Sequence, residues 1–254
     1  MNQILLSSKI PDSSRKLKII PEAVSYSDAE IRDKLLQLDK TCCVVKNGDA
    51  VGVCLEEDAD ESSSGTSMSL LAQALPLKTT QLGDPEFIKV HGLKMAYMTG
   101  SMANGIASEN LVIPSGKVGL LSSFGAAGLL PSRIEQAINI IQKALPDGPY
   151  AFNLIHSPSE DAIERAAVDL YLKYGVRTVE ASAFLGLTPN IVRYRVAGLR
   201  RSAQNQVEIT NRVIAKISRV EVASKFMAPA PEAMLNKLLE EKSITREQAQ
   251  LAAA

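Results

Sequence analysis

The chain has 254 residues, of which 46% are hydrophobic and 22% are charged, as in ordinary globular proteins. Lys and Arg total 28, and Asp and Glu also total 28, so no net charge favours nucleic acid or an acidic membrane surface. No apolar run approaches the roughly 20 residues that span a bilayer, and the amino terminus lacks the basic start and apolar core of a signal peptide. These features predict a cytoplasmic protein without a nucleic-acid or membrane partner.

The cysteines and histidines are few. Cys42 and Cys43 are neighbours in a strand-like run, so their side chains point to opposite faces and cannot easily hold one ion together. Cys54 is the third cysteine, and the chain has only two histidines. We interpret the cysteines as structural thiols and predict no metal site.

The first 82 residues are expected to form a small α+β appendage. Ser27 and Glu30 have the spacing of a helix start, and Ile31, Leu35 and Leu38 then follow at helical spacing. The turn Asn47-Gly48-Asp49 separates two apolar runs, 41–46 and 50–55, which predicts a β-hairpin. The acidic and Ser-rich run 56–65 is typical of a solvated, mobile loop.

From residue 83 onward, apolar runs alternate with segments of helical periodicity, which indicates parallel strands with crossover helices. Strands are predicted at 95–99, 118–122, 150–155, 177–181 and 213–218, with another short strand at 207–210. Helices are predicted at 106–114, from Pro131 to about 145, and at 157–174, 189–195, 232–239 and 245–253. Ligands bind at the carboxyl ends of such strands, but a closed barrel needs eight of them. The sequence therefore favours either a smaller sheet or part of a barrel.

Three motifs carry a resemblance to one family: MTGSMANGIASENLV (98–112), FGAAGL (124–129) and FNLIHSP (152–158). With the flanking residues 82–252, they closely resemble the trans-acting enoyl reductases of polyunsaturated fatty acid and trans-acyltransferase polyketide synthases. This family is related to the nitronate monooxygenases (2-nitropropane dioxygenases). The resemblance implies an FMN-dependent (β/α)₈ TIM barrel with a helical insertion, about twice as long as this chain.

On this comparison the chain is an incomplete TIM barrel, an amino-terminal portion. It would comprise the appendage (1–82), the first half of the FMN-binding barrel (83–225) and part of the helical insertion (226–254). The family's Gly-Gly-His segment and phosphate-binding loops do not occur in this sequence. We therefore expect the chain alone to be inactive, and the open edge of a half-barrel to favour self-association.

The resemblance also implies site residues. Gly100, Ser101, Met102 and Ala103 should line the flavin ring, since small residues let the backbone approach closely; a tight turn that serves only packing is the alternative. Asn153 should contact the ring or only tie down a neighbouring loop. The remaining positions that should contact the flavin or its phosphate side are Glu180, Ser182 and Lys216. Lys216 lies in an apolar strand and needs a flavin acceptor or Glu180 as a partner.

His156 is the one catalytic candidate, although it could instead cap the helix that follows it. The run 124–128 is expected to cover the active site or to serve glycine-assisted packing. NADPH or NADH would be the reductant. Acyl carrier protein domains would be the partners, docked on the basic cluster Arg193, Arg195, Arg200 and Arg201. The alternatives are a half-barrel that serves only interaction and binds no flavin, and a nitronate monooxygenase-like oxidase.

Overall fold

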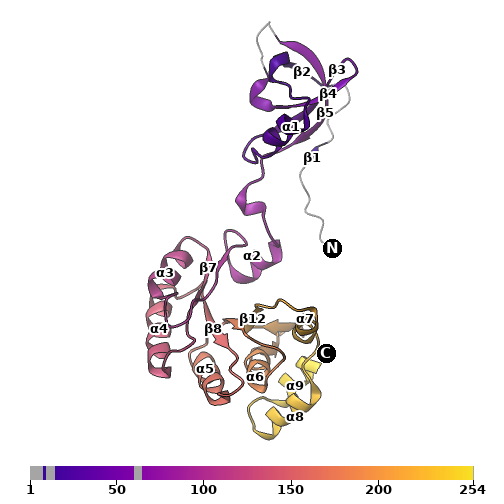
Figure 1. Ribbon diagram of the computed structural model, residues 1–254. Helices are drawn as coiled ribbons and strands as arrows, with labels where there is room; N and C mark the ends of the chain where they lie inside the picture. The colour runs from indigo at the N-terminus through magenta and orange to yellow at the C-terminus, as the bar shows by residue number, and fades with distance from the viewer. Residues whose placement is uncertain (1–7, 10–14, 60–64, 254) are drawn as a thin grey trace. The chain divides into compact units, whose positions relative to one another are not determined.

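The computed structural model describes residues 8–9, 15–59 and 65–253. The chain divides into two compact units, Met1–Leu82 and Gly83–Ala254 (Figure 1). Of the amino-terminal run that was assessed as a signal peptide, only Ser8, Lys9 and the residues from Arg15 onward are described. Residues 60–64 of the acidic run also lie outside the described residues. No helix in the described part is both long enough and apolar enough to cross a membrane.

The first unit is an antiparallel sheet with one α-helix. Its strands are β1 (Ser8–Lys9), β2 (Lys16–Ile19), β3 (Cys42–Asn47), β4 (Ala50–Leu55) and β5 (Thr66–Ala74). Their order is β1-β5-β3-β4, with β2 also paired to β5. The helix is α1 (Asp28–Leu35), and short 3₁₀ turns occupy Pro21–Ala23, Glu56–Asp58 and Thr79–Gln81. The core of the unit consists of Ile19, Val24, Cys43, Val45, Cys54, Met68 and Leu70.

Two local predictions for this unit are confirmed, and one is wrong. The β3–β4 hairpin turns at Gly48, whose φ of 59° suits glycine. Ser27 caps α1, because its Oγ accepts from the Glu30 amide at 3.4 Å. The apolar stripe fails: the helix ends at Leu35, so Leu38 is not part of it, and both leucines are more than half exposed.

The second unit is built on a five-stranded parallel sheet in the order β12-β9-β8-β7-β6. The strands are β6 (Met98–Thr99), β7 (Leu121–Phe124), β8 (Ala151–Ile155), β9 (Thr178–Ser182) and β12 (Arg212–Ala215). The helices are α2 (Pro85–His91), α3 (Glu109–Lys117), α4 (Pro131–Ala144), α5 (Asp161–Lys173), α6 (Pro189–Ala197), α7 (Val220–Met227), α8 (Glu232–Glu240) and α9 (Arg246–Ala253). The sheet curls, and helices follow its outer face in chain order (Figure 1). The predicted partial TIM barrel is confirmed.

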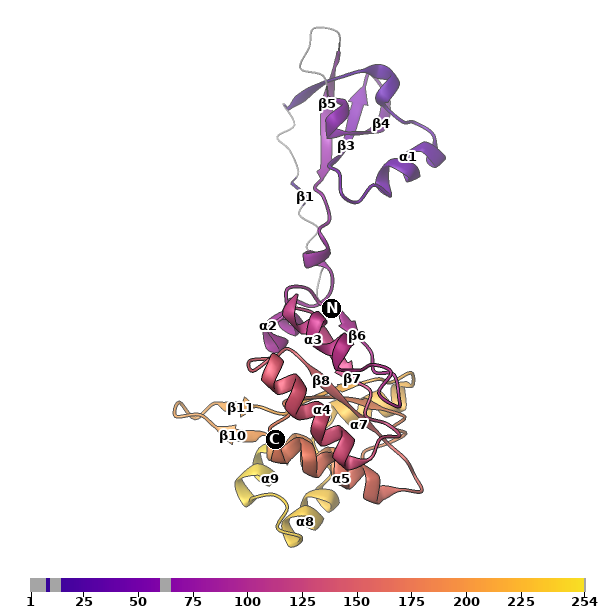
Figure 2. The ribbon, with the colours of Figure 1, turned by 90° about the vertical axis from the view of Figure 1, so that its left-hand side faces the viewer.

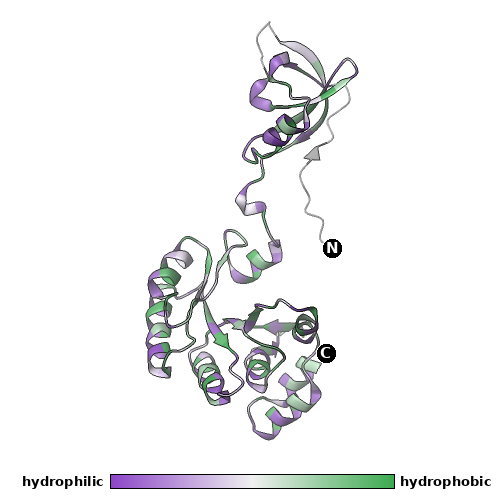
Figure 3. Cartoon of the chain, viewed as in Figure 1, coloured by the Kyte–Doolittle hydropathy of each residue, from purple (hydrophilic) through white to green (hydrophobic). Residues whose placement is uncertain are grey.

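Alternate residues of the strands face opposite sides of this sheet. Phe152, Leu154, Val179 and Ala181 face outward and pack with the inner sides of α4, α5 and α6 in the main core. These helices are amphipathic, with green and purple segments interleaved along each ribbon (Figure 3). The same core includes Leu235, Leu238, Ile244 and Ala249, so the helical segment α8–α9 is packed into it.

The inward face has an apolar layer at the amino-terminal ends of the strands. Leu121 and Ala151 are buried there together with Leu93, and Met98 and Ile214 pack against them. Phe87 and Ile88 of α2 complete this cluster, so α2 closes the amino-terminal end of the half-barrel. The inward positions nearer the carboxyl ends are different in character and form the site described below.

Several predicted boundaries differ from the structure. The first strand is short, Met98–Thr99, and the second begins three residues later than predicted, at Leu121–Phe124. The helix predicted at 106–114 is α3, which begins only at Glu109, because residues 100–107 form an ordered loop. Residues 207–209 form β11, which pairs antiparallel with β10 (Leu199–Arg201) in a hairpin that extends from the unit (Figure 2). The helices α2 and α7 have no counterpart among the predicted elements.

The start of α9 is capped by Thr245 and Gln248. The Thr245 amide donates to Gln248 Oε1 at 2.9 Å, and the Gln248 amide donates to Thr245 Oγ1 at 3.1 Å. This reciprocal capping satisfies two amides at the helix start. Gln248 Nε2 also donates to the Ala197 carbonyl at 3.0 Å, so the cap ties α9 to the end of α6.

Candidate functional site

The polar residues of the inward face converge at the carboxyl ends of the strands. Glu180 on β9 is at the centre and is paired in register with Asn153 on β8 and Ile214 on β12. Lys216 follows the end of β12, and its amide continues the ladder by donating to the Ala181 carbonyl at 2.9 Å. Gly100 follows the end of β6. Four strands therefore deliver predicted site residues to one edge of the sheet.

Glu180 holds two of these segments together. Its side chain is 1% exposed, and its Oε1 lies 2.7 Å from Lys216 Nζ, whose side chain is 51% exposed. The other oxygen, Oε2, accepts from the Ser101 amide at 2.8 Å. A Cβ on Gly100 would lie 3.6 Å from Glu180 Oε1 and 3.8 Å from Lys216 Nζ, so the backbone of this loop passes directly over the ion pair.

The ionisation of Glu180 is set by opposing effects. Burial raises the pKa of Glu180, but its contacts with Lys216, the Ser123 hydroxyl and the Ser101 amide outweigh burial and hold the pKa below its ordinary value. The side chain is therefore a carboxylate at neutral pH. The partner predicted for Lys216 is thus present within the chain as Glu180, although the Lys216 side chain is still half exposed and its ammonium group has further donors for a ligand.

Asn153 is buried, and its amide is fully engaged on the donor side. Nδ2 donates to the Glu180 carbonyl at 3.1 Å and to Ser182 Oγ at 2.9 Å. The backbone carbonyl oxygen of Asn153 accepts from the buried Tyr171 hydroxyl at 2.6 Å. Asn153 therefore ties β8 to the neighbouring strand β9 rather than to a loop, and its side-chain oxygen is left for a ligand.

The loop after β6 is fastened to the loop after β7. The Gly105 amide donates to the Gly125 carbonyl at 2.9 Å, and the Gly125 amide donates to the Ala107 carbonyl at 2.9 Å. The contact is so close that a Cβ on Gly125 would lie 1.6 Å from the Met102 carbonyl oxygen. The glycine-assisted packing expected for residues 124–128 is therefore what the structure shows, and this packing sets the course of residues 100–103.

His156 lies at the end of β8 in a separate polar group. Its Nδ1 lies 3.0 Å from Glu164 Oε2, and the two side chains are 22% and 1% exposed, respectively. The other oxygen of Glu164 accepts from the Thr188 hydroxyl. The imidazole also stacks on Phe184 at 5.3 Å between ring centroids. A buried carboxylate thus orients a partly exposed histidine, which is a common arrangement for a group that carries a proton.

Sequence reasoning missed Glu164 because apolar residues are expected on the inward face of α5, and Ile163 is the apolar residue beside Glu164. Ile163 is half exposed, and the buried residues of the helix are Glu164, Val168 and Tyr171. Their spacing of i, i+4 and i+7 is present in the sequence as a signal. A glutamate is expected on the polar face of a helix from its residue type alone. Its burial at an inward position of α5 therefore suggests that Glu164 has a function.

The four arginines of the predicted basic cluster do not form one patch of unpaired positive charge. Arg193 Nη2 lies 2.7 Å from Asp169, and Arg200 Nε lies 2.6 Å from Glu208. Arg201 contacts Asn205, and Arg195 Nη1 donates to the Asn211 carbonyl at 2.8 Å. Two of the four charges are therefore neutralised within the unit.

Among the described residues, no group of three or more His, Cys, Asp or Glu side chains could hold a metal ion.

A parallel half-barrel with a polar group at the carboxyl ends of its strands is the architecture of barrel enzymes. Comparisons with known proteins then specify the class. Residues 20–76 match the family model "Fatty acid synthase subunit PfaD N-terminal domain". The chain also resembles the crystal structure of the enoyl reductase domain of MlnA from the macrolactin cluster of Bacillus amyloliquefaciens, with a TM-score of 0.66 and 37% identity. That match covers 69% of this chain and 40% of the MlnA domain chain.

Two curated relatives are similar in sequence. One component of the polyunsaturated fatty acid synthase of Thraustochytrium sp. is 42% identical over 252 residues, which is 97% of this chain and 16% of the relative. Polyketide biosynthesis protein PksE of Bacillus subtilis is 45% identical over 171 residues, which is 67% of this chain and 22% of PksE. The chain thus spans less than a quarter of the length of either. The predicted resemblance to the reductases of polyunsaturated fatty acid and polyketide synthases is confirmed.

Proposed function

We propose that this chain forms one wall of an FMN-dependent enoyl reductase site that acts in trans on α,β-unsaturated acyl thioesters of acyl carrier protein domains. The observation that carries the proposal is the Glu180–Lys216–Ser101 cluster at the carboxyl ends of the strands, in a fold shared with an enoyl reductase domain. The polyketide and polyunsaturated fatty acid relatives support an acyl thioester as the substrate. Either NADPH or NADH would supply the reducing equivalents.

The residues present fit one edge of a flavin ring. The glycine at position 100 keeps the space beside the ion pair free of a side chain, and Lys216 is half exposed with donors left over. A flavin edge presents carbonyl oxygens and ring nitrogens, which require such donors. Lys216, the 100–103 backbone and the Asn153 side-chain oxygen would hold this edge. When bound, FMN supplies hydride transfer from the nicotinamide to the β-carbon of the substrate.

The chain's own residues have distinct roles in this proposal. Glu180 fixes Lys216 and the Ser101 amide in position, so that the site is organised before a ligand arrives. Reduction of the double bond also requires a proton at the α-carbon. His156, oriented by Glu164, is the residue that we propose holds this proton.

The proposal is tested by titrating the 254-residue chain with FMN and following the quenching of flavin fluorescence. We expect saturable binding that weakens about tenfold or more in Lys216→Met and in Gly100→Leu, since one loses a charged donor and the other fills the space above it. Lys173→Met is the matched control, because Lys173 pairs with Glu135 on the outer helices. Equal binding by all variants, or no saturable binding, would refute the flavin assignment.

The activity test separates the enzymatic alternatives. The chain loaded with FMN is assayed for NAD(P)H-dependent reduction of a crotonyl thioester and for oxidation of a nitroalkane. We expect the thioester to be the substrate if a complete site assembles. Nitroalkane oxidation without thioester reduction would favour the nitronate monooxygenase alternative. FMN binding without either activity is the result that we expect of a chain that holds only one wall of the site.

A further inference from the structure

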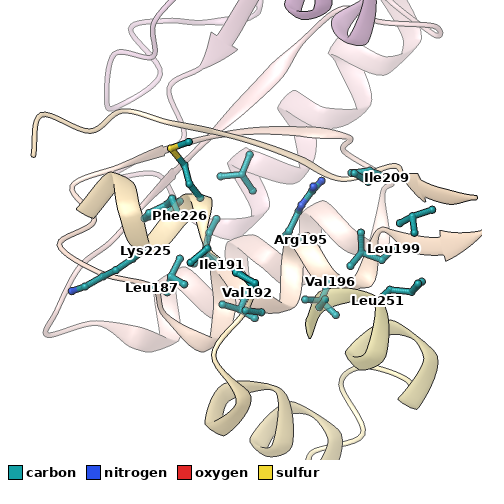
Figure 4. A pocket seen from close by; sticks show the side chains of 17 residues that line it. Leu187, Ile191, Val192, Arg195, Val196, Leu199, Ile209, Lys225, Phe226 and Leu251 are labelled. Atoms are coloured by element: carbon teal, nitrogen blue, oxygen red, sulfur yellow. The ribbon is translucent and has the colours of Figure 1, made fainter. Parts of the chain in front are cut away.

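A hollow lies outside the barrel, on the outer side of β12. It is a cavity of about 300 Å³ between α6, the β10–β11 hairpin, the segment from α7 to α8 and the last turn of α9 (Figure 4). This volume is at the lower end of the range for small-molecule sites, about 300–1,000 Å³. Most of its wall is aliphatic or aromatic, including Ile191, Val192, Val196, Leu199, Val213 and Phe226. Such a wall favours an apolar ligand.

Two cations line this cavity: Arg195, which is half-buried in the apolar wall, and Lys225, which is exposed. Arg195 lies between Ile191 and Ile209 in the close view (Figure 4). Its described polar contact is the Asn211 carbonyl, at 2.8 Å from Nη1. The neighbouring arginines of this segment, Arg193 and Arg200, each have a carboxylate partner, whereas no carboxylate in the described part of the chain pairs with Arg195.

The charge of Arg195 is therefore poorly compensated. Burial, together with the positive charge of Arg212, lowers the pKa of Arg195 below its ordinary value. A half-buried guanidinium normally has an anionic partner, because removing it from water is costly. An apolar cavity with one such cation on its wall matches an amphiphile that has an apolar chain and one anionic group.

We propose that this cavity binds an aliphatic acyl chain whose carboxylate pairs with Arg195. The site is distinct from the proposed flavin site and does not require a flavin. It is nevertheless close to the candidate histidine through a chain of aromatic contacts. Phe226 on the cavity wall packs edge-to-face on Phe184 at 5.8 Å, and Phe184 stacks on His156. A ligand that moves Phe226 would therefore act on the ring that supports His156.

The test uses the full chain without flavin and two ligands with the same chain, decanoate and neutral decanoyl-pantetheine, measured by titration calorimetry. We expect decanoate to bind at one site. Arg195→Met should weaken decanoate about tenfold or more and leave decanoyl-pantetheine almost unchanged. Arg193→Met on the same helix is the matched control and should change neither, since Arg193 pairs with Asp169.

A second variant keeps the test decisive if Arg195→Met unfolds. Ala230→Phe fills the cavity from the α7–α8 side and should abolish the binding of both decanoate and decanoyl-pantetheine. Unchanged binding in that variant, or equal effects of Arg193→Met and Arg195→Met, would overturn the proposal. Binding of decanoyl-pantetheine without decanoate would overturn the carboxylate assignment, in favour of an acyl thioester. None of these outcomes depends on the FMN titration, so failure here is distinguishable from failure of the reductase proposal.

Discussion

Replacing Lys216 by Met tests whether the Glu180 carboxylate is kept in the half-barrel by its cation. Met has a similar length and an apolar side chain, so the substitution removes the charge and little of the volume. It leaves the Glu180 carboxylate, 1% exposed, with the Ser101 amide and the Ser123 hydroxyl as its contacts. A buried carboxylate without a counter-charge is expected to destabilise the second unit.

The size of the effect follows from burial. Removing one partner of a fully buried ion pair costs about 3–5 kcal/mol. Because the Lys216 side chain is 51% exposed, solvent already screens part of this interaction, and we expect roughly half of that cost, about 2 kcal/mol. For a unit of this size, that corresponds to a fall in Tm of about 4–8 °C.

The loss should depend on pH in a defined direction. The folded pKa of Glu180 lies below its unfolded value, so the carboxylate stabilises the wild-type fold above the unfolded pKa, and this contribution is lost as the pH falls through the folded pKa. In Lys216→Met the main cause that lowers the pKa is absent and burial raises it. Burying the protonated acid of Glu180 then costs less free energy than burying the carboxylate. The difference in the free energy of unfolding between the wild type and Lys216→Met should therefore narrow below about pH 4.3.

Urea unfolding followed by tyrosine fluorescence suits this experiment, since five of the six tyrosines are in the second unit and the chain has no Trp. Lys89→Met is the matched control, because the Lys89–Glu86 pair is exposed and 3.4 Å long. We expect Lys89→Met to lower the free energy of unfolding by less than about 0.5 kcal/mol. Equal losses in the two variants, or a loss for Lys216→Met that grows in acid, would refute the reasoning.

Two further predictions concern the loop packing at Gly125 and the half-buried side chain of His91. Gly125→Ala should destabilise the second unit by about 3 kcal/mol or more, because the new Cβ would overlap the Met102 carbonyl. The control is Gly186→Ala, whose new Cβ would lie 3.5 Å from the flexible tip of Lys225. Thermal unfolding should show almost no change in the stability of this control. Burial and the Arg212 charge lower the pKa of His91 to about 4, so the free energy of unfolding should fall as the pH drops from about 6.5 towards 4. His91→Gln should reduce this dependence in Tm measurements, and a slope equal to that of the wild type would contradict a role for His91.

The parallel-sheet half of the fold could be predicted because its strands are nearly continuous apolar runs. The predicted strands 150–155 and 177–181 lie within one residue of β8 and β9, and Pro131 marks the start of α4. The first unit is harder to predict, because β2 and β5 pair over long distances in sequence and carry mixed side chains. Propensity does not reveal such pairing.

The candidate site could be predicted in position but not in its internal contacts. Strand ends locate Gly100, Asn153 and Lys216, and an unpaired Lys in an apolar strand requires a partner. Sequence could not show that the Ser101 amide donates to Glu180 or that both donors of Asn153 are occupied. These contacts depend on a register across three strands and on the close packing at Gly125, which tertiary structure alone determines.

The two layers of the inward face argue that the polar cluster is more than a structural device. One layer is apolar, with Leu121, Ala151 and Ile214, and two residues further along the same strands the layer is polar, with Ser123, Asn153 and Lys216 around Glu180. Replacing a buried ion pair by packed apolar residues is often neutral or stabilising, so stability alone does not require the second layer to differ from the first. Titratable groups that are costly to bury and that meet at the carboxyl ends of barrel strands are instead typical of a place where chemistry is done.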